Sequence, residues 1–133
     1  MFENLSEHLV TFANDIDFED PKVGQSGTYV AELRDPSGAA IGTVDGFYKI
    51  VTRRESDDEL MTCITEKIAL ADGDVHVEAW ARFSNLISGE WLYCPVVGVS
   101  GSYAGRTGVR QWRPVDPGKV AEAKLVFFST LLS

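Results

Sequence analysis

Apolar and polar residues alternate along most of this chain, and a period of two restricts it to β-structure. The pattern is clearest at residues 75–83, where every second side chain is apolar: Val75, Val77, Ala79, Ala81 and Phe83. Successive side chains of a strand point to opposite faces, so this series is predicted to face the protein interior. The Asp72-Gly73 pair before it is favoured where a tight turn joins antiparallel strands. An antiparallel sheet is therefore expected.

Similar segments recur at short intervals and lack helical periodicity. We predict strands at residues 5–13, 28–34, 40–52, 60–70, 75–83, 90–99, within 98–114 and at 119–125. Eight short strands joined by turns fit a closed barrel better than an open sheet with two exposed edges. The expected fold class is all-β, an up-and-down antiparallel β-barrel like that of the lipocalins, in one domain spanning residues 1–133.

Two segments interrupt this regular pattern. Pro95 cannot donate a hydrogen bond to a sheet, so it predicts an edge, bend or bulge in its strand. Residues 14–27 are acidic and contain proline and glycine, which indicates a long surface loop that could cover one barrel mouth.

Several positions predicted to face the interior carry small residues: Ala31, Ala79, Ala81, Gly108, Ala121 and Ala123. A barrel of eight strands encloses either a packed core or one small ligand. Because small side chains leave space that larger ones would fill, we expect an internal apolar cavity.

Charge and residue usage exclude several functional classes. The net charge of -8 argues against a phosphate-binding surface, so nucleic acid is not an expected partner. No apolar run approaches the ~20 residues of a membrane helix, and residues 1–14 do not resemble a signal peptide, so we expect a cytoplasmic protein.

Cys63 and Cys94 are expected to be reduced and buried. His8 and His76 have no companion ligands at useful spacing, so no metal site is predicted.

Residues 98–114, GVSGSYAGRTGVRQWRP, combine glycines with arginine and tryptophan, and we interpret them as two strands meeting at a turn. Gly101 and Gly105 are suited to a sharp barrel corner. Beyond them, alternation places Arg110 and Trp112 on one face, where they could form the floor or wall of a cavity. Alternatively, Arg110 caps a barrel end and Trp112 fills the core.

The segment from residue 70 to 113 resembles the spirotetronate cyclases, small bacterial β-barrel Diels–Alderases of polyketide biosynthesis. The matching motifs are D-G followed by H-x-E-x-W-A-x-F at 72–83, the strand at 91–95, G-V-S-G-x-Y-x-G-x-T-G at 98–108 and R-Q-W-R at 110–113, with a weaker match at 27–46. This resemblance implies an eight-stranded barrel, commonly a homodimer. Its lumen would fold a linear tetronate or tetramate polyketide for an intramolecular [4+2] cycloaddition that gives a spiro-fused cyclohexene without a cofactor.

The resemblance also implies roles for individual residues. Tyr29 and Trp112 would be catalytic, and the substrate would contact Tyr29, Ile64, Phe83, Cys94, Trp112 and Pro114. Glu7 and Arg110 would form an ion pair at one barrel end, which makes the odd face of residues 5–13 the inner face. Such a pair is physically sensible because a carboxylate buried alone would cost several kcal/mol.

Ile64 and Cys94 stand where the family has tyrosines, which enlarges and dries the expected cavity. The donor of a hydrogen bond to the substrate carbonyl is therefore open: Tyr29, Thr62, Trp112 or water. The indole N–H of Trp112 is expected to be free to donate.

A cycloaddition transfers no proton and needs no nucleophile, so it suits a chain in which no catalytic triad or paired carboxylates are apparent. Holding diene and dienophile in a reactive geometry supplies up to about 7–11 kcal/mol. Two alternatives remain open: a lipocalin-like carrier of an apolar metabolite, and another barrel cyclase resembling the allene oxide cyclases. The outward aromatic residues Trp80, Trp91 and Tyr93 favour a homodimer, unless the N-terminal segment or the long loop covers them.

Overall fold

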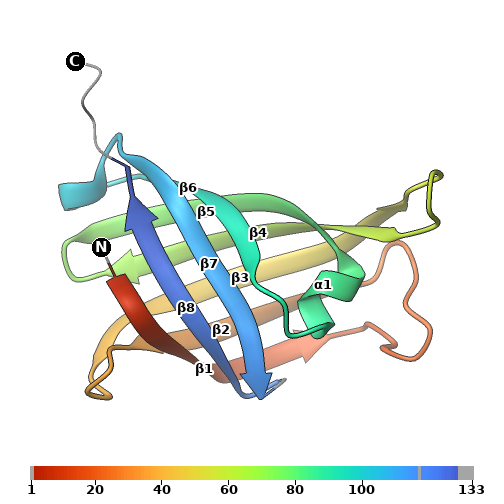
Figure 1. Ribbon diagram of the computed structural model, residues 1–133, viewed down its shortest axis with the longest axis horizontal. Coiled ribbons are helices and arrows are strands. Elements are labelled where there is room, and N and C mark those ends of the chain that lie inside the picture. Colours follow the sequence, from red (N-terminus) through yellow and green to blue (C-terminus); the bar gives the residue numbers. More distant parts are fainter. Residues whose placement is uncertain (1, 117, 129–133) are drawn as a thin grey trace.

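A closed barrel of eight antiparallel strands forms the protein, as the alternation predicted (Figure 1). The computed structural model describes residues 2–116 and 118–128. Each strand pairs with the next along the chain, and β8 pairs with β1. The strands are β1 (Phe2–Asn14), β2 (Ser26–Arg34), β3 (Ala40–Arg53), β4 (Leu60–Leu70), β5 (Gly73–Arg82), β6 (Leu92–Gly98), β7 (Thr107–Asp116) and β8 (Val120–Phe127). The predicted all-β, up-and-down fold is confirmed.

The two ends of the barrel differ in their connections. One end carries the turn at 35–39, the tight β4–β5 turn and the 3-10 helix η1 (Gly101–Tyr103). The other end carries the loop at 15–25, the turn at 54–59 and the short helix α1 (Phe83–Ile87), which lie together in Figure 1. We call these the closed end and the open end.

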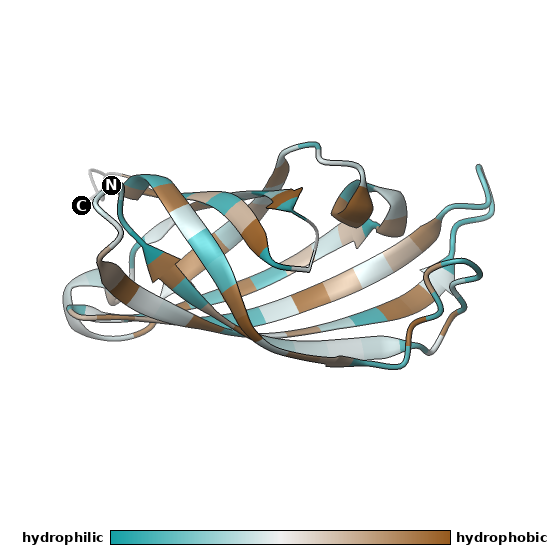
Figure 2. Cartoon of the chain, turned by 90° about the horizontal axis from the view of Figure 1, so that it is seen from below, coloured by the Kyte–Doolittle hydropathy of each residue, from teal (hydrophilic) through white to brown (hydrophobic). Residues whose placement is uncertain are grey.

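The closed half of the barrel is filled by aliphatic side chains. Apolar and polar residues alternate along the strands in Figure 2, as a sheet with one buried face requires. The fully buried residues of this half include Leu33, Val44, Ile68, Val75, Val77 and Val96. Each contributes about 1.5–3 kcal/mol on leaving water. Tyr103 of η1 covers this end, and its ring stacks on Phe127 with centroids 4.8 Å apart.

Residues 98–114 differ from the predicted pair of strands. β6 ends at Gly98, and the connection to β7 at Thr107 runs through η1. It folds back on β6, since Gly98 exchanges hydrogen bonds with Gly105 and Arg106. A Cβ on Gly98 would lie 1.6 Å from the carbonyl oxygen of Tyr103, so only glycine fits there.

The β5–β6 contact is the shortest ladder of the barrel. Only residues 75–77 of β5 pair with β6, and the last pair is Val77 with Val96. The residue just before Val96 is Pro95, which has no N–H. Residues 92–95 of β6 pair only with β7. The predicted interruption at Pro95 is therefore present: β6 pairs with β5 only after this residue.

Three further expectations need correction. Phe83 does not continue β5 but begins α1, although its side chain is buried. Strand β1 has a bulge between Leu9 and Thr11, which turns Phe12 rather than Thr11 inward. Cys63 is half-buried, not buried, because the inner face of β4 is its even-numbered face and Cys63 pairs with the exposed Trp80 outside.

Within the described ranges, 2–116 and 118–128, no helix has the length and apolar character needed to cross a membrane.

Candidate active site

The open half of the barrel encloses a cavity of about 420 Å³. A volume of this size is typical of a small-molecule site. Every residue that the sequence assigned to the site lines it: Glu7, Tyr29, Ile64, Phe83, Cys94, Arg110, Trp112 and Pro114. The walls are largely apolar, with Leu9, Ala31, Leu92 and Ala121 among them. Of the small residues predicted to leave space inside the barrel, Ala31 and Ala121 line the cavity. Ala79, Ala81 and Ala123 do not line it and lie in the packed core.

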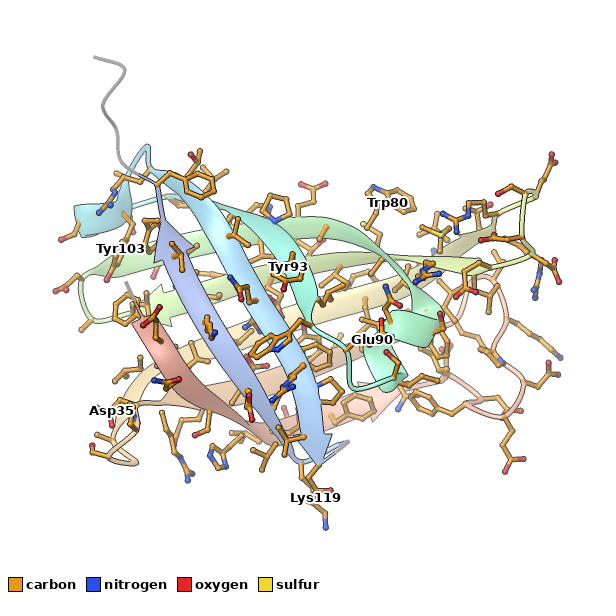
Figure 3. All side chains as sticks on the ribbon, in the orientation of Figure 1. Asp35, Trp80, Glu90, Tyr93, Tyr103 and Lys119 are labelled. Atoms are coloured by element: carbon orange, nitrogen blue, oxygen red, sulfur yellow. The ribbon has the colours of Figure 1, made fainter. Side chains whose placement is uncertain are left out.

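The mouth of the cavity is formed by the loop at 15–25, by α1 and by the β7–β8 turn. Phe18 of the loop and Ile87 of α1 both line the cavity while remaining about half exposed. The Phe18 ring lies 6.1 Å from the ring of Phe83. Lys119 of the β7–β8 turn also lines the cavity and is labelled at the lower edge of the molecule in Figure 3. The long loop therefore makes one wall of the entrance.

The floor of the cavity holds a charged cluster. Arg110 Nη2 donates to Glu7 Oε1 at 2.6 Å, and Arg110 Nε donates to Glu66 Oε1 at 2.6 Å. A second bond joins Arg110 Nη2 to Glu66 Oε2 at 3.2 Å. The hydroxyl of Tyr29 also donates to Glu66 Oε2. Side chains of four strands, β1, β2, β4 and β7, thus join in one hydrogen-bonded cluster.

The position of this cluster corrects the expectation that it lies at a barrel end. Along β1, Glu7 stands between Leu5 of the core and Leu9 of the cavity wall. Along β4, Glu66 stands between Ile68 of the core and Ile64 of the wall. The cluster therefore separates the packed half from the hollow half, in the middle of the barrel.

Burial governs the electrostatics of the floor. Desolvation raises the pKa of Glu7, and the Glu66 charge adds to this, whereas Arg110 and, more weakly, the Trp112 side chain lower it. Desolvation and the Glu66 charge also raise the pKa of Tyr29 well above its ordinary value. Burial opposes the charged form of Arg110, but Glu66 and Glu7 raise its pKa, so the guanidinium stays charged. Burial raises the pKa of the Cys94 thiol to about 11.

Sequence reasoning missed two residues of this site. Glu66 binds Arg110 through two oxygens, and Tyr48 lines the cavity with its ring 6.0 Å from that of Tyr29. Both could have been found by alternation. Glu66 shares its face of β4 with Ile64 and Ile68, and Tyr48 lies on β3 two residues before the buried Ile50.

Two of the groups nominated as hydrogen-bond donors to a substrate, Tyr29 and Thr62, are not placed to donate to one. The Tyr29 hydroxyl is bound to Glu66. Thr62 is fully buried between Leu60 and Ile64, its hydroxyl oxygen has no partner among the described residues, and it does not line the cavity. Trp112 lines the cavity near Glu7, where its side chain weakly lowers the pKa of that carboxyl, and a free indole N–H stays a prediction.

Among the described residues, no group of three or more histidine, cysteine or acidic side chains is placed to hold a metal ion. His8 bonds to Ser6, and His76 lies beside Glu78 on the outer face of β5.

Comparison with known proteins identifies relatives of this barrel. The allene oxide cyclase barrel-like domain matches residues 6–127. The crystal structure of AbnU, described as an exo-specific intermolecular Diels–Alderase, is 34% identical with a TM-score of 0.86, over 92% of this chain and 90% of AbnU. The Diels–Alderase AbmU from Streptomyces koyangensis is 28% identical with a TM-score of 0.89, over 96% of this chain and 62% of AbmU.

A third structure is described as a nonspecific heme-binding cyclase that catalyses [4 + 2] cycloaddition during neoabyssomicin biosynthesis. It is 29% identical with a TM-score of 0.88, over 95% of this chain and 61% of that cyclase. The present chain therefore spans somewhat less than two thirds of the length of AbmU and of this cyclase. No curated protein sequence gives a significant match. The chain belongs to the allene oxide cyclase barrel-like family, among its Diels–Alderase cyclases.

Proposed function

We propose that this chain catalyses an intramolecular [4+2] cycloaddition of a linear polyketide bearing an acyl tetronate or tetramate ring, forming a spiro-fused cyclohexene. The observation that supports this best is the apolar cavity of about 420 Å³, closed at its floor and open at one mouth. Such a space folds one flexible chain so that its two ends meet. Holding diene and dienophile in a near-attack geometry lowers the barrier without any cofactor, proton transfer or covalent intermediate.

Individual roles follow from the positions of the lining side chains. Trp112 is the catalytic residue of the wall, where its indole restricts the folded substrate. Tyr29 contributes its ring, while its hydroxyl holds Glu66. Ile64, Phe83, Cys94 and Pro114 complete the surface against which the substrate folds. The ion pair of Arg110 with Glu7 and Glu66 fixes the floor.

A homodimer in the cytoplasm is the form in which we propose the protein acts. Trp80 and Tyr93 are 59% and 63% exposed on the outer face of β5 and β6, and both point outward in Figure 3. Exposed aromatic side chains of this kind favour association. Trp91 does not add to it, because Arg113 and Lys124 lie over its ring at 4.8 and 5.2 Å.

Light scattering at tens of micromolar is expected to give twice the mass of the chain, and a monomeric mass would refute the dimer. The free thiols of Cys63 and Cys94 suit a reducing compartment.

Incubation with a linear acyl tetronate that carries a diene and an exocyclic methylene tests the activity. We expect a product of identical mass and new chromatographic mobility, formed faster than without protein. A lipocalin-like carrier would return the compound unchanged. Supplying diene and dienophile as two separate molecules distinguishes the intramolecular reaction from an intermolecular one, because only the latter yields a product with the summed mass.

A further inference from the structure

The floor of the cavity contains one more carboxyl group than its cation can neutralise. Glu7 and Glu66 are only 6% and 5% exposed, and both bind the guanidinium of Arg110. If both were ionised, a buried cluster would carry a net negative charge in contact with an apolar cavity. Two carboxylates that share one site in a low dielectric do not ionise together, so one holds a proton.

The hydrogen bonds decide which carboxyl holds it. Glu66 accepts three donors: Arg110 Nε, Arg110 Nη2 and the hydroxyl of Tyr29. Glu7 accepts one, from Arg110 Nη2. Donors to a carboxylate favour its charged form, so we infer that Glu7, the carboxyl with fewer donors, carries the proton. The raised pKa of Glu7, caused first by its burial, agrees with this assignment.

The neighbouring titratable groups leave this assignment intact. Glu66 on β4, Arg110 on β7, Tyr29 on β2, Tyr48 on β3 and Cys94 on β6 face the same cavity, and Lys119 stands at its mouth. Tyr29, Tyr48 and Cys94 are neutral because burial raises the pKa of each. The core residues of β5 and β8 are alanine, valine and leucine.

A carboxylic acid on the cavity floor supplies a hydrogen-bond donor, which the hydroxyl groups of Tyr29 and Thr62 do not. We propose that Glu7 is a catalytic residue which, in its neutral form, donates a hydrogen bond to the carbonyl group conjugated with the dienophile. This inference rests on the proposed cycloaddition. The bond withdraws electron density from the dienophile, and it acts strongly because the cavity excludes water. Glu7 keeps its proton throughout, so no atom is transferred.

Infrared spectroscopy of the ligand-free protein tests the protonation of Glu7 without any turnover. We expect a C=O stretch of a protonated carboxyl at neutral pH that shifts in heavy water and disappears in Glu7→Gln. The matched control is Glu122→Gln, which alters the half-exposed pair with Arg113 on the barrel surface and should retain the band. Absence of the band from the unaltered protein would overturn the proposal, whatever the activity of the protein.

A non-reactive probe tests the donated bond separately. A 3-acyltetronic acid with a saturated side chain and a ¹³C-labelled acyl carbonyl cannot cyclise. Its carbonyl stretch should move to lower frequency on binding to the unaltered protein and to Glu7→Gln, whose amide still donates, but not on binding to Glu7→Leu. An equal shift in Glu7→Leu, or its loss in Tyr48→Phe alone, would assign the donor elsewhere.

Kinetics with the linear acyl tetronate complete the test. The rate of the unaltered protein should fall about tenfold per pH unit once Glu7 ionises, while Glu7→Gln keeps a flat profile with the same substrate. Glu7→Leu should lose about 10- to 100-fold in kcat at pH values where Glu7 is protonated, and this difference should shrink once Glu7 ionises. Parallel profiles for the unaltered protein and Glu7→Gln would contradict the proposal. If no protein variant turns over the tetronate, the proposed function fails, and the two infrared results still decide the state and role of Glu7.

Discussion

Arg110 holds two carboxyl groups with three hydrogen bonds from Nε and Nη2, an arrangement that only a planar guanidinium provides. Its removal leaves both carboxyl groups buried without a cation. The side chain is therefore a structural centre of the barrel as well as the floor of the cavity.

Replacement of Arg110 by methionine should lower the free energy of unfolding by about 3–5 kcal/mol, because it strands a buried charge. Urea unfolding at neutral pH measures this loss. The control is Arg34→Met, which breaks the exposed pair with Glu32 at 2.7 Å and should cost no more than about 1 kcal/mol. Equal losses in the two variants would mean that the cluster is hydrated.

Trp112→Phe should keep the fold while slowing the reaction. Trp112 is only partly buried and packs at the edge of the core, so a smaller ring removes cavity wall rather than support. We expect a melting temperature near that of the unaltered protein and a rate about tenfold lower, equivalent to about 1.4 kcal/mol of barrier. Unfolding of this variant would place Trp112 in the structural core, and an unchanged rate would remove it from the site.

At the scale of elements, the connection between β6 and β7 shows how glycines lock the closed end. Gly101 has φ +62°, and a Cβ on it would lie 2.0 Å from the carbonyl oxygen of Asp72 in the β4–β5 turn. Gly105 has a similar φ of +76°, but a Cβ on it would meet no neighbouring atom of the described residues within 4 Å. The two positions share backbone conformation and differ in contact.

Gly105→Ala should therefore cost about 1–2 kcal/mol, the ordinary penalty of a left-handed conformation. Gly101→Ala should cost about 1–3 kcal/mol more, because its methyl group also collides with the neighbouring turn. Thermal unfolding of both variants gives the comparison. Identical stabilities would show that the two connections are not in firm contact.

The elements also show where sequence reasoning succeeds and where it stops. Alternation located all eight strands and placed Arg110 and Trp112 on one face, whereas the family resemblance was needed to turn Glu7 inward. It missed α1, because five residues are too few to display a period of 3.6. It also missed the bulge after Leu9, since no glycine or proline marks it, and therefore misjudged which face of late β1 lines the cavity. Glu66 was overlooked because its neighbours Thr65 and Lys67 suggest a solvated segment.

For the whole molecule, buried phenols make stability depend on alkaline pH. Burial raises the pKa of Tyr48 to about 12 and that of Tyr29 well above its ordinary value. Above pH ~10 the unfolded chain loses these protons while the folded barrel retains them, so the unfolded state gains stability as pH rises.

The urea midpoint should therefore be lower at pH 11 than at pH 9. Tyr48→Phe should reduce this decline, because one of the phenols whose pKa burial raises is gone. Tyr93→Phe provides the control, since Tyr93 is exposed on β6 and its removal should leave the decline unchanged. A midpoint that is constant between the two pH values would contradict the burial of Tyr29 and Tyr48.

The boundary at the Glu7–Arg110–Glu66 cluster divides the barrel into a half that specifies the fold and a half that admits variation. Side chains in the open half, such as Ile64, Cys94 and Pro114, line the cavity. Natural drift or laboratory selection at these positions reshapes the lumen while the aliphatic half continues to close the barrel. New substrates are therefore accessible to such a scaffold through single replacements, without intermediate sequences that fail to fold.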